Sequence, residues 1–446
     1  MTLPKVLVLG VGPLPVQQAR RLYAPGLRTW SFARQLARRG HQVVCATVDF
    51  GGRKEAEPLT EPWSEGAGTV TFRPLSFDVK QIIKEVRAIQ HELAPECAVA
   101  TTDLMNRGLA QAHLPVPVWL DFNGHPLVER QMQAAVHGSD AAVKEQWDMV
   151  LPALMFGDRF STCSTAQKHA LIGELGVAGR LNRLTGWHDL VEAIPPVCPE
   201  REFPPAPAVV RGTLCDADSF ILLWTGGYNT WSDVDTLFGG LEAAMERHPR
   251  LVYVSTGGAI AGHDEVTFQR FREMVDASPR RARYHFAGWV ANEEMAAYYQ
   301  DADAALNLDV PTYEAMLGFR NRVQEWVVAQ VPVLTTPLSE ITRELTDAGL
   351  ATPVAPGNPL ALADAIGALI AEPADVADER ARRAKKWLRE RYDAENLLAG
   401  LCDWCTEPRP APDLPAPELR PTSRWPAPDN NLSLAHRPYL KKNGLL

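Results

Sequence analysis

The sequence lacks the features that distinguish membrane, secreted and nucleic-acid-binding proteins. Its apolar runs fall short of the roughly 20 residues that a membrane-spanning helix needs, and its first residues enter a strand pattern directly instead of forming a signal peptide. The seven cysteines are odd in number and scattered, as expected in a reducing cytoplasm. The net charge of −9 provides no basic excess for nucleic acid or for an anionic membrane. These absences predict a cytoplasmic protein that does not bind nucleic acid.

A dinucleotide fingerprint and a metal-binding pattern are also missing. The loop GVGPLP carries Pro15 where the fingerprint needs its third glycine, so an NAD-dependent oxidoreductase, which Asp49 would suit, is a less favoured alternative. No Asp-x-Asp pair stands in a place typical of a metal site, and Cys402 and Cys405 form a single CxxC without a second pair. The sequence therefore predicts no metal and no tightly bound cofactor.

The length and the strand–helix pattern predict two domains. At 446 residues the chain is too long for one hydrophobic core. Buried strands that end in glycines alternate with helices in two successive series, which predicts an α/β fold with two parallel sheets. We place the first domain at 1–197, a Pro- and Ala-rich linker at 198–217, the second domain at 218–374, a helical segment at 375–406 and a disordered Pro-rich tail at 407–446.

The stretch from Asn307 to Thr336 contains the clearest candidate site. It reads as a strand end, a loop, a helix from about Phe319 to Gln330 and a further strand. Arg320 and Arg322 fall in the first turn of that helix, where cations oppose the helix dipole and cost a few tenths of a kcal/mol unless an anion binds. The sequence therefore predicts a diphosphate site, and Gly318 would let the ligand approach the backbone.

The same stretch resembles the donor-site motif of retaining family 4 glycosyltransferases. In EWVVAQVPVL, Glu325 stands seven residues before Pro332, as the second Glu of that motif does. The common form of the family has its first Glu where this chain has Leu317. One branch has it three residues earlier, followed by a Phe-Arg-x-Arg segment, and Glu314 with GFRNR matches that branch.

The resemblance covers most of residues 5 to 400 and implies the glycosyltransferase-B architecture, in which two Rossmann-like domains face each other across the substrate cleft. It implies an acceptor domain first and a donor domain second, with the 375–406 helix crossing back to the first domain. Glu325 would then bind the ribose hydroxyls of a nucleoside diphosphate sugar, Glu314 the sugar, and Arg320 and Arg322 the diphosphate, alongside Phe319 and Asn321.

A glycine-rich loop in the second domain is a further part of the implied donor site. In GGYNTWSD the backbone of Gly226 and Gly227 can hold a phosphate, next to Tyr228. The family form has Arg and Lys where this chain has Gly227 and Ser232, and we infer that the two arginines of the GFRNR segment supply the missing charge. Trp289 and Val290 match the turn that contacts the nucleobase.

The first domain carries weaker candidates. A helix from about Thr29 to Arg39 follows a glycine-containing loop, which makes Gly26, Arg28 and Thr29 cleft residues in the resemblance. The fourth apolar strand ends in a polar cluster with Asn123 and His125, where ligands collect in open α/β sheets. In the resembled family the loop after this strand carries a residue that faces the transferred sugar, and His125 is the candidate for it.

The predicted function is a metal-independent retaining glycosyltransferase of polysaccharide or glycoconjugate biosynthesis. The acceptor would be a glycan, a lipid-linked sugar or a small molecule. The basic run ERARRAKKWLRERY is compatible with peripheral membrane contact. The alternatives are a non-catalytic glycosyltransferase-like subunit and a nucleotide-sugar epimerase of the same fold. A phosphorylase would need a cofactor-binding Lys, and the second domain has almost none before Lys385.

Overall fold

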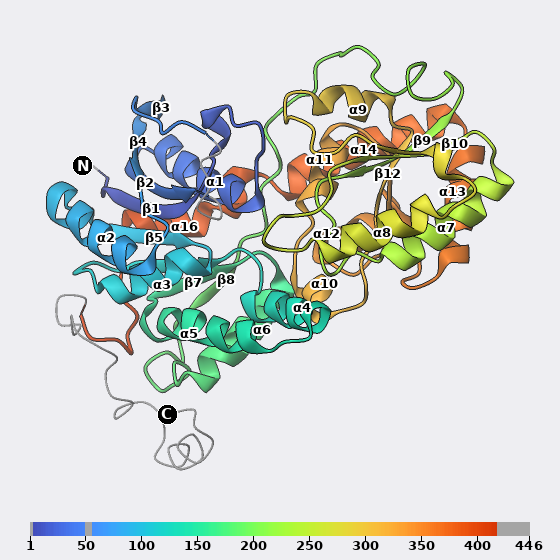
Figure 1. The fold of residues 1–446 in the computed structure, drawn as a ribbon. Helices are drawn as coiled ribbons and strands as arrows, with labels where there is room; N and C mark the ends of the chain where they lie inside the picture. The colour runs from blue at the N-terminus through green and yellow to red at the C-terminus, as the bar shows by residue number, and fades with distance from the viewer. Residues whose placement is uncertain (1–2, 50–55, 417–446) are drawn as a thin grey trace. The chain divides into compact units, whose positions relative to one another are not determined.

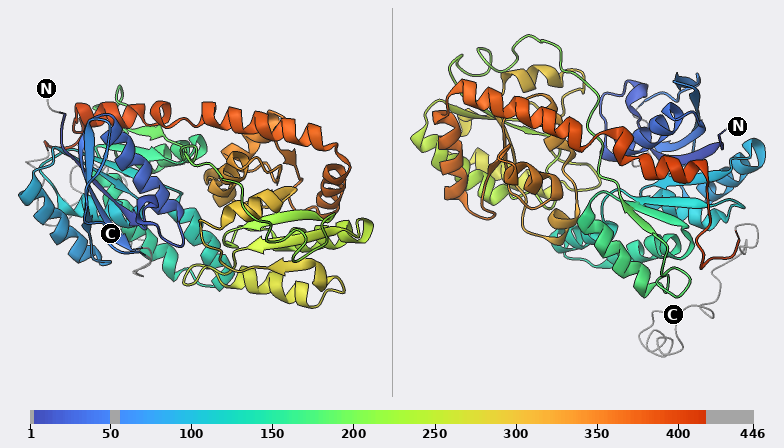
Figure 2. Two further views of the ribbon diagram at one scale, coloured as in Figure 1. Left: turned by 90° about the horizontal axis from the view of Figure 1, so that it is seen from above. Right: turned by 180° about the vertical axis from the view of Figure 1, so that it is seen from behind.

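The structure is a computed structural model that describes residues 3–49 and 56–416 (Figure 1). The chain divides into two compact units. Unit 1 takes its residues from 1–127, 141–194 and 397–446, and unit 2 takes its residues from 128–140 and 195–396. Each unit is built around its own parallel sheet with helices on both faces (Figure 2). The predicted α/β class with two Rossmann-like domains is therefore confirmed.

Within the described residues, the sheet of unit 1 has eight strands in the order β3-β4-β2-β1-β5-β6-β7-β8. All neighbours pair in parallel except β3 and β4, which form an antiparallel edge. The strands are β1 (Val6–Gly12), β2 (Gln42–Asp49), β3 (Trp63–Glu65), β4 (Gly68–Pro74), β5 (Cys97–Thr101), β6 (Val118–Phe122), β7 (Arg159–Thr162) and β8 (Val191–Ala193). The helices of unit 1 are α1 (Ala24–Arg38), α2 (Val79–Leu93), α3 (Asp103–Ala112), α5 (Ala141–Phe156), α6 (Thr165–Val177) and α16 (Ala399–Thr406).

Among the described residues of unit 2, six parallel strands follow the order β11-β10-β9-β12-β13-β14. The strands are β9 (Phe220–Thr225), β10 (Leu251–Thr256), β11 (Tyr284–Phe286), β12 (Ala304–Asn307), β13 (Val333–Thr335) and β14 (Thr352–Pro353). The helices are α7 (Val234–Arg247), α8 (Val266–Asp276), α9 (Met295–Asp301), α10 (Tyr313–Leu317), α11 (Asn321–Val328), α12 (Glu340–Asp347), α13 (Pro359–Ala371) and α14 (Ala374–Arg391). Most of α4 (Pro126–His137) also belongs to unit 2, and α15 (Ala394–Leu397) lies where the chain returns to unit 1.

Local sequence explains these elements. The central strands β1, β5 and β6 are buried along their whole length, as expected for strands covered by helices on both faces. In α2, Ile82, Val86 and Ile89 recur at helical spacing and are the buried positions. The side chain of Asp78 caps the first turn of α2 by accepting from the Gln81 amide at 3.0 Å. The strand–helix alternation in the sequence therefore predicted the architecture correctly.

Two helix predictions were wrong in their limits. The helix expected from about Thr29 begins at Ala24, because Pro25 suits the first turn and the chain becomes helical earlier than the polar loop suggested. The single helix expected over 375–406 consists of α14, α15 and α16. α14 belongs to unit 2 and α16 to unit 1.

The predicted linker, 198–217, differs in the structure, because its residues pack on unit 2. The Asp301 carboxylate accepts from the amides of Val209 and Val210 at 2.8 and 2.7 Å, and Gln300 bonds the backbone of Ala206. The chain enters unit 2 at Pro195. The compositional bias toward proline marked the boundary but did not produce a free segment.

The predicted disorder of the Pro-rich tail fails for its first part. Asp413 forms an ion pair with Arg180 at 2.7 Å, and these two side chains are 2% and 1% exposed. The Ala411 amide donates to Asp158 at 2.8 Å. Ala411, Asp413 and Leu414 therefore pack within unit 1, while the rest of the predicted tail, 417–446, lies outside the described residues.

Among the described parallel strands, each sheet has a point at which its strand order reverses. In unit 2 the reversal falls between β9 and β12, and in unit 1 between β1 and β5. Open α/β sheets bind ligands beyond the carboxyl ends of the strands at this switch point. The loops after β9 and β12 are therefore the first place to examine in unit 2.

Candidate functional site

The loops that follow β9 and β12 are joined directly. The Asp233 amide donates to Leu308 O at 3.0 Å, and the Val310 amide donates to Trp231 O at 2.8 Å. The first loop is the glycine-rich segment, and the second leads into α10 and α11. The structure thus brings together the two segments that the sequence singled out in the second domain.

A buried triad of charges fixes the second loop. The Arg320 guanidinium contacts Asp309 Oδ2 and Glu314 Oε2, both at 2.8 Å. None of the three residues is more than 5% exposed. Asn307 adds a hydrogen bond to Asp309 at 2.9 Å. The charge of Arg320 is therefore matched by two carboxylates and is not free for a ligand, contrary to its prediction as a diphosphate contact.

Burial and charge act in opposite directions within this triad. Burial raises the pKa of Glu314 above its usual value, although Arg320 opposes the shift. Burial alone would lower the pKa of Arg320, but the attraction of Asp309 and Glu314 outweighs it, and the pKa of Arg320 is raised. The guanidinium thus stays charged and holds the loop. In this arrangement Glu314 contacts Arg320 instead of an open sugar subsite.

Gly318 makes room for the side chains of the triad, while its predicted contact with a ligand stays a prediction. A Cβ atom on Gly318 would lie 2.7 Å from Glu314 Oε1 and 2.9 Å from Arg320 Nη1. Gly318 is the C-cap of α10, whereas Arg320 is the N-cap of α11. The predicted helix start at Phe319 was therefore early, and the close approach that requires glycine is made by the two charged side chains.

Arg322 has a different environment from Arg320. Its Nη2 donates to Gly227 O at 2.7 Å, and its guanidinium lies over the Trp224 ring at 4.9 Å. Its Nη1 is buried, and no hydrogen-bond partner for it exists among the described residues. Burial lowers the pKa of Arg322 to about 10, so the side chain remains a cation at neutral pH. This arginine reaches the glycine loop from the opposite segment, as the sequence led us to expect.

The glycine loop itself is tightly packed. Gly226 has φ of +78°, which favours glycine, and its amide donates to Thr256 O at 2.9 Å. A Cβ on Gly227 would lie 2.4 Å from the Ile260 side chain. The Gly226 amide is therefore used within the fold, so the prediction that it donates a hydrogen bond to a phosphate was wrong. Gly227 remains the backbone candidate for that contact.

Glu325 lies one turn into α11 and has a partner that the sequence did not indicate. Arg201 Nη2 lies 2.5 Å from Glu325 Oε2. The Glu325 side chain is 19% exposed. Burial raises the pKa of Glu325, and the attraction of Arg201 opposes the shift. The carboxylate thus stays reachable while a cation from the segment before β9 holds one of its oxygens.

Other predicted donor residues divide into core and loop positions. Tyr228 is fully buried, stacks on Trp224 at 4.7 Å and bonds the Tyr253 hydroxyl at 2.7 Å, so its side chain belongs to the core and the prediction of ligand contact was wrong. Phe319 packs against Tyr392 at 5.6 Å. Trp289 donates to Ala259 O at 3.1 Å beside the glycine loop. Val290 follows it and is partly buried, and Asn321 is the first residue of α11.

The candidates of unit 1 next to β1 are structural in this fold. Arg28 forms a bidentate ion pair with Asp121, with contacts of 3.0 and 2.6 Å, and is 3% exposed. Thr29 Oγ1 accepts from the Val11 amide at 3.2 Å and contacts Thr101 Oγ1 at 2.9 Å. A Cβ on Gly26 would lie 2.2 Å from Pro13 O. These contacts join α1 to the sheet, so the predicted cleft contact of these side chains was wrong.

His125 and Asn123 lie beyond the carboxyl end of β6, as predicted. His125 Nε2 lies 3.2 Å from Glu174 Oε1, and the ring is 8% exposed. Its Nδ1 is buried without a hydrogen-bond partner among the described residues. Asn123 is partly buried. Contact of either residue with sugar or acceptor stays a prediction.

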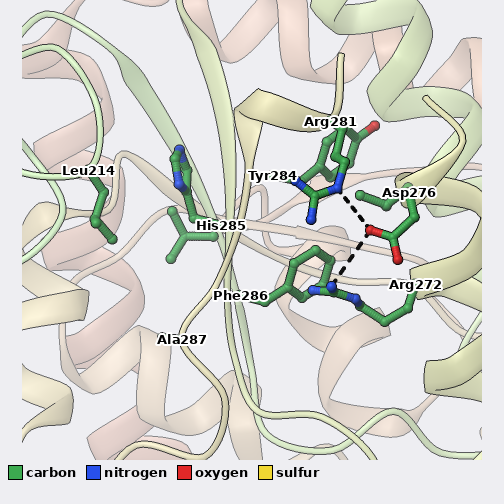
Figure 3. Close-up of a pocket in the computed structure, with 10 residues that line it drawn as sticks. Leu214, Arg272, Asp276, Arg281, Tyr284, His285, Phe286 and Ala287 are labelled. Atoms are coloured by element: carbon green, nitrogen blue, oxygen red, sulfur yellow. Dashed lines mark hydrogen bonds and ion pairs between the residues drawn. The ribbon is translucent and has the colours of Figure 1, made fainter. Parts of the chain in front are cut away.

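A pocket of about 300 Å³ lies elsewhere in unit 2, around edge strand β11 (Figure 3). Figure 3 shows Arg272 and Arg281 directed at the same carboxylate, Asp276, which they approach to 3.6 and 3.0 Å. Arg272 also lies over the Phe286 ring at 4.1 Å. Both arginines are paired with Asp276, and β11 is at the sheet edge, so the pocket is a weaker candidate than the switch point.

Sequence reasoning missed two residues of the switch-point region. Asp309 ends a buried strand pattern, and that position could have identified it as a loop anchor. Arg201 gave no comparable signal, because it stands in a Pro-rich stretch that suggests a linker. Only the path of that stretch along α11 brings Arg201 to Glu325.

Residues 219–372 match the family model described as Glycosyl transferases group 1. The match lies within unit 2 and spans both loops of the switch point. It supports a glycosyltransferase group 1 domain in this part of the chain. A search of curated proteins finds no match.

Solved structures share the fold over almost the whole chain. Sucrose-phosphate synthase from Thermosynechococcus elongatus has a TM-score of 0.67 at 16% identity, with 90% of this chain and 98% of that chain covered. The α,α-trehalose-phosphate synthase (UDP-forming) from Burkholderia vietnamiensis has 0.63 at 13% identity with the same coverage. Anabaena HepE, solved in complex with UDP-glucose, has 0.61 at 16% identity, again with 90% and 98% covered. The fold is thus that of glycosyltransferase-B proteins.

Among the residues that the structure describes, no helix combines the length and apolar character needed to cross a bilayer.

Proposed function

We propose that the protein is a retaining glycosyltransferase that moves a sugar from a nucleoside diphosphate sugar to an acceptor hydroxyl. The observation that carries the proposal is Arg322, a partly buried cation at the switch point of unit 2. It contacts Gly227 O, its Nη1 is buried without a hydrogen-bond partner, and it forms no ion pair with a carboxylate among the described residues. The family match over 219–372 supports the same assignment.

A diphosphate suits this arrangement physically. Burying an unmatched charge is unfavourable, and the lowered pKa of Arg322 reflects that cost. An anion that binds beside Arg322 provides the missing countercharge. The amides of Asn321 and Arg322 open α11 and have no partners within the helix, at the positive end of its dipole, whereas the Val323 amide donates to Arg320 O at 3.0 Å. Arg320, held by Asp309 and Glu314, fixes the loop that presents them.

Glu325 supplies the ribose contact in this proposal. A carboxylate can accept hydrogen bonds from both ribose hydroxyls, and the side chain of Glu325 is partly exposed. Trp289 and Val290 would contact the base through their backbone, as the resemblance implies. The UDP-glucose bound to HepE makes UDP-sugars the first donors to test.

In the reaction, the bond between the anomeric carbon and the β-phosphate oxygen breaks while the acceptor oxygen bonds that carbon from the same face. The acceptor proton passes to the departing phosphate oxygen. Negative charge grows on the β-phosphate, so the cation at Arg322 and the amides of α11 bind the transition state more tightly than the ground state. Metal independence is part of the proposal because the protein supplies this positive charge. The acceptor class and a role in polysaccharide or glycoconjugate synthesis are further parts of it.

The test is a thermal-shift series on the full chain with UDP, GDP, ADP, dTDP and NAD. A ligand at 100 times its Kd stabilises the folded state by about 2.7 kcal/mol, which is easily measured. One nucleoside diphosphate should stabilise the wild type. Arg322→Met should weaken that binding by about 10- to 100-fold, because hydrogen bonds to charged groups contribute about 1.5–3 kcal/mol. The ligand-free variant should unfold no earlier than the wild type, since a partly buried charge without a carboxylate partner is removed.

The matched control is Arg270→Met. Arg270 is also an arginine of unit 2, but it is 61% exposed and paired with Asp235. This variant should bind the nucleotide as the wild type does. Stabilisation by NAD alone would favour the oxidoreductase, and nucleotide binding without sugar turnover would favour the non-catalytic subunit. Binding that survives Arg322→Met would refute the assignment of the diphosphate site.

A further inference from the structure

Arg201 joins two parts of unit 2 that lie on the nucleotide side of the proposed site. One amino group of its guanidinium lies 2.5 Å from Glu325 Oε2 on α11. The other donates to Asn292 Oδ1 at 2.6 Å, in the loop just after Trp289 and Val290. The guanidinium also lies over the Phe203 ring at 4.4 Å. A single side chain thus connects the carboxylate proposed for ribose to the loop proposed for the base.

The segment that carries Arg201 is held on both sides. Gln324, the residue before Glu325, donates to Pro196 O at 2.8 Å. Glu202 forms ion pairs with Lys385, at 2.9 Å, and with Arg389 of α14. Further along, Asp301 accepts from the backbone of Val209 and Val210. The position of Arg201 is therefore fixed by the fold and is not one of many rotamers of a surface side chain.

We propose that Arg201 is a positioning residue of the nucleotide site, which acts through Glu325. It fixes one carboxylate oxygen and keeps the carboxylate ionised, so that the remaining acceptor positions face the ribose hydroxyls. The inference rests on the proposed function and extends it to a residue outside the family match, which begins at 219.

The geometry leaves room for both partners of the carboxylate. An ionised carboxylate offers about four acceptor positions, and the ion pair with Arg201 is made at one oxygen, Oε2. Glu325 Oε2 is a buried atom, whereas the side chain as a whole is 19% exposed, so the exposed part is an atom other than the oxygen that contacts Arg201. Ribose hydroxyls can therefore bind without displacing the arginine.

The charged and titratable groups around Glu325 make the inference testable by pH. Arg201 and Cys198 come from the segment before β9, and Tyr299 comes from α9. α14, which also packs on α11, contributes Lys385 and Arg389, and both are paired with Glu202. Burial raises the pKa of Glu325 and Arg201 opposes that shift. Removal of Arg201 should therefore move the loss of nucleotide binding at acidic pH to a higher pH.

The experiment measures the Kd of UDP, GDP and ADP and of their 2′-deoxy counterparts between pH 5 and 8. The proteins are the wild type, Arg201→Met, Arg201→Lys and Glu325→Gln, each as the full chain. For the nucleotide that binds, Arg201→Met should lose about tenfold in affinity at pH 7, as expected when a charged hydrogen-bond partner is perturbed. Its preference for ribose over deoxyribose should fall to that of Glu325→Gln. In Arg201→Lys, the pH at which nucleotide binding is half lost should return part of the way to the wild-type value.

Arg211→Met is the matched control. Arg211 lies on the same segment and pairs with Asp303 at 2.8 Å, away from Glu325. If Arg201 only anchored the segment, both variants would shift thermal stability alike, and neither would change the pH midpoint or the ribose preference. That outcome overturns the inference and leaves the proposed function standing. If the wild type binds none of these nucleotides, the proposed function fails, and the role of Arg201 fails with it.

Discussion

Replacing Arg320 by Met tests the buried triad most directly. The substitution leaves Asp309 and Glu314 facing each other without their cation, and these two side chains are 2% and 5% exposed. Removing one partner from a buried ion pair costs about 3–5 kcal/mol, because an unmatched charge stays in the interior. We therefore expect a loss of this size near pH 7, which is a large share of the stability of one unit.

The loss should depend on pH with a definite sign. Burial already raises the pKa of Glu314, so the folded state binds the proton more tightly than the unfolded chain. A carboxyl of this kind gives its full stability below its unfolded pKa, near 4.3, and that stability is lost as pH rises through the folded pKa. Without Arg320 the folded pKa rises further. The variant should therefore be destabilised more at pH 8 than at pH 5.

Hydrogen exchange of the full chain, read on peptides that cover β12 and α11, measures this locally. Arg250→Met is the control, because its pair with Asp218 is 70% and 62% exposed and should contribute about 0–1 kcal/mol. The neutral triple variant Asp309→Asn, Glu314→Gln, Arg320→Met should recover much of the loss. An equal loss at both pH values, or a loss no larger than that of the control, would refute this account of the triad.

Three further predictions follow from the packing and the proposed chemistry. Gly257→Ala should lower the melting temperature and weaken nucleotide stabilisation, because its Cβ would lie 1.9 Å from Gly226 O, whereas Gly173→Ala, with nothing within 4 Å, should be neutral or slightly stabilising. Asp413→Ala should destabilise unit 1 by about 3–5 kcal/mol in hydrogen exchange of β7 and α6, because it leaves Arg180 buried and unpaired, and protection unchanged from wild type would contradict this. Sugar transfer should proceed equally in EDTA and in Mg²⁺, and a strict metal requirement would overturn metal independence.

Much of the fold could be predicted from the sequence. The buried runs of β1, β9 and β12 and the helices between them specify a parallel sheet, since a strand covered on both faces must be apolar throughout. The place of the candidate site also followed from the sequence, because Arg322 and the glycine loop lie at the carboxyl ends of such strands. The division into two units was predicted because the chain is too long for one core and carries two successive strand–helix series.

The partners of individual side chains could not be predicted. Arg320 and Arg322 are two residues apart at the start of one helix and are equivalent in any reading of the pattern. In the fold, the guanidinium of Arg320 contacts two carboxylates. The guanidinium of Arg322 donates to the carbonyl of Gly227 and lies over the Trp224 ring. The same holds for three residues that were predicted to contact a ligand, Arg28, Thr29 and Tyr228. Their polar atoms form hydrogen bonds with side chains of the β-strands instead.

The sequence by itself thus determined the strand and helix pattern, the two-unit organisation and the loop where positive charge meets the glycines. These features depend on periodicity and on residues that are neighbours in the chain. The tertiary structure alone decided which cation is neutralised, which glycine accommodates a side chain, and that Arg201 reaches Glu325. Those outcomes depend on the direction in which each side chain leaves the backbone and on contacts between distant segments, and local patterns do not encode either.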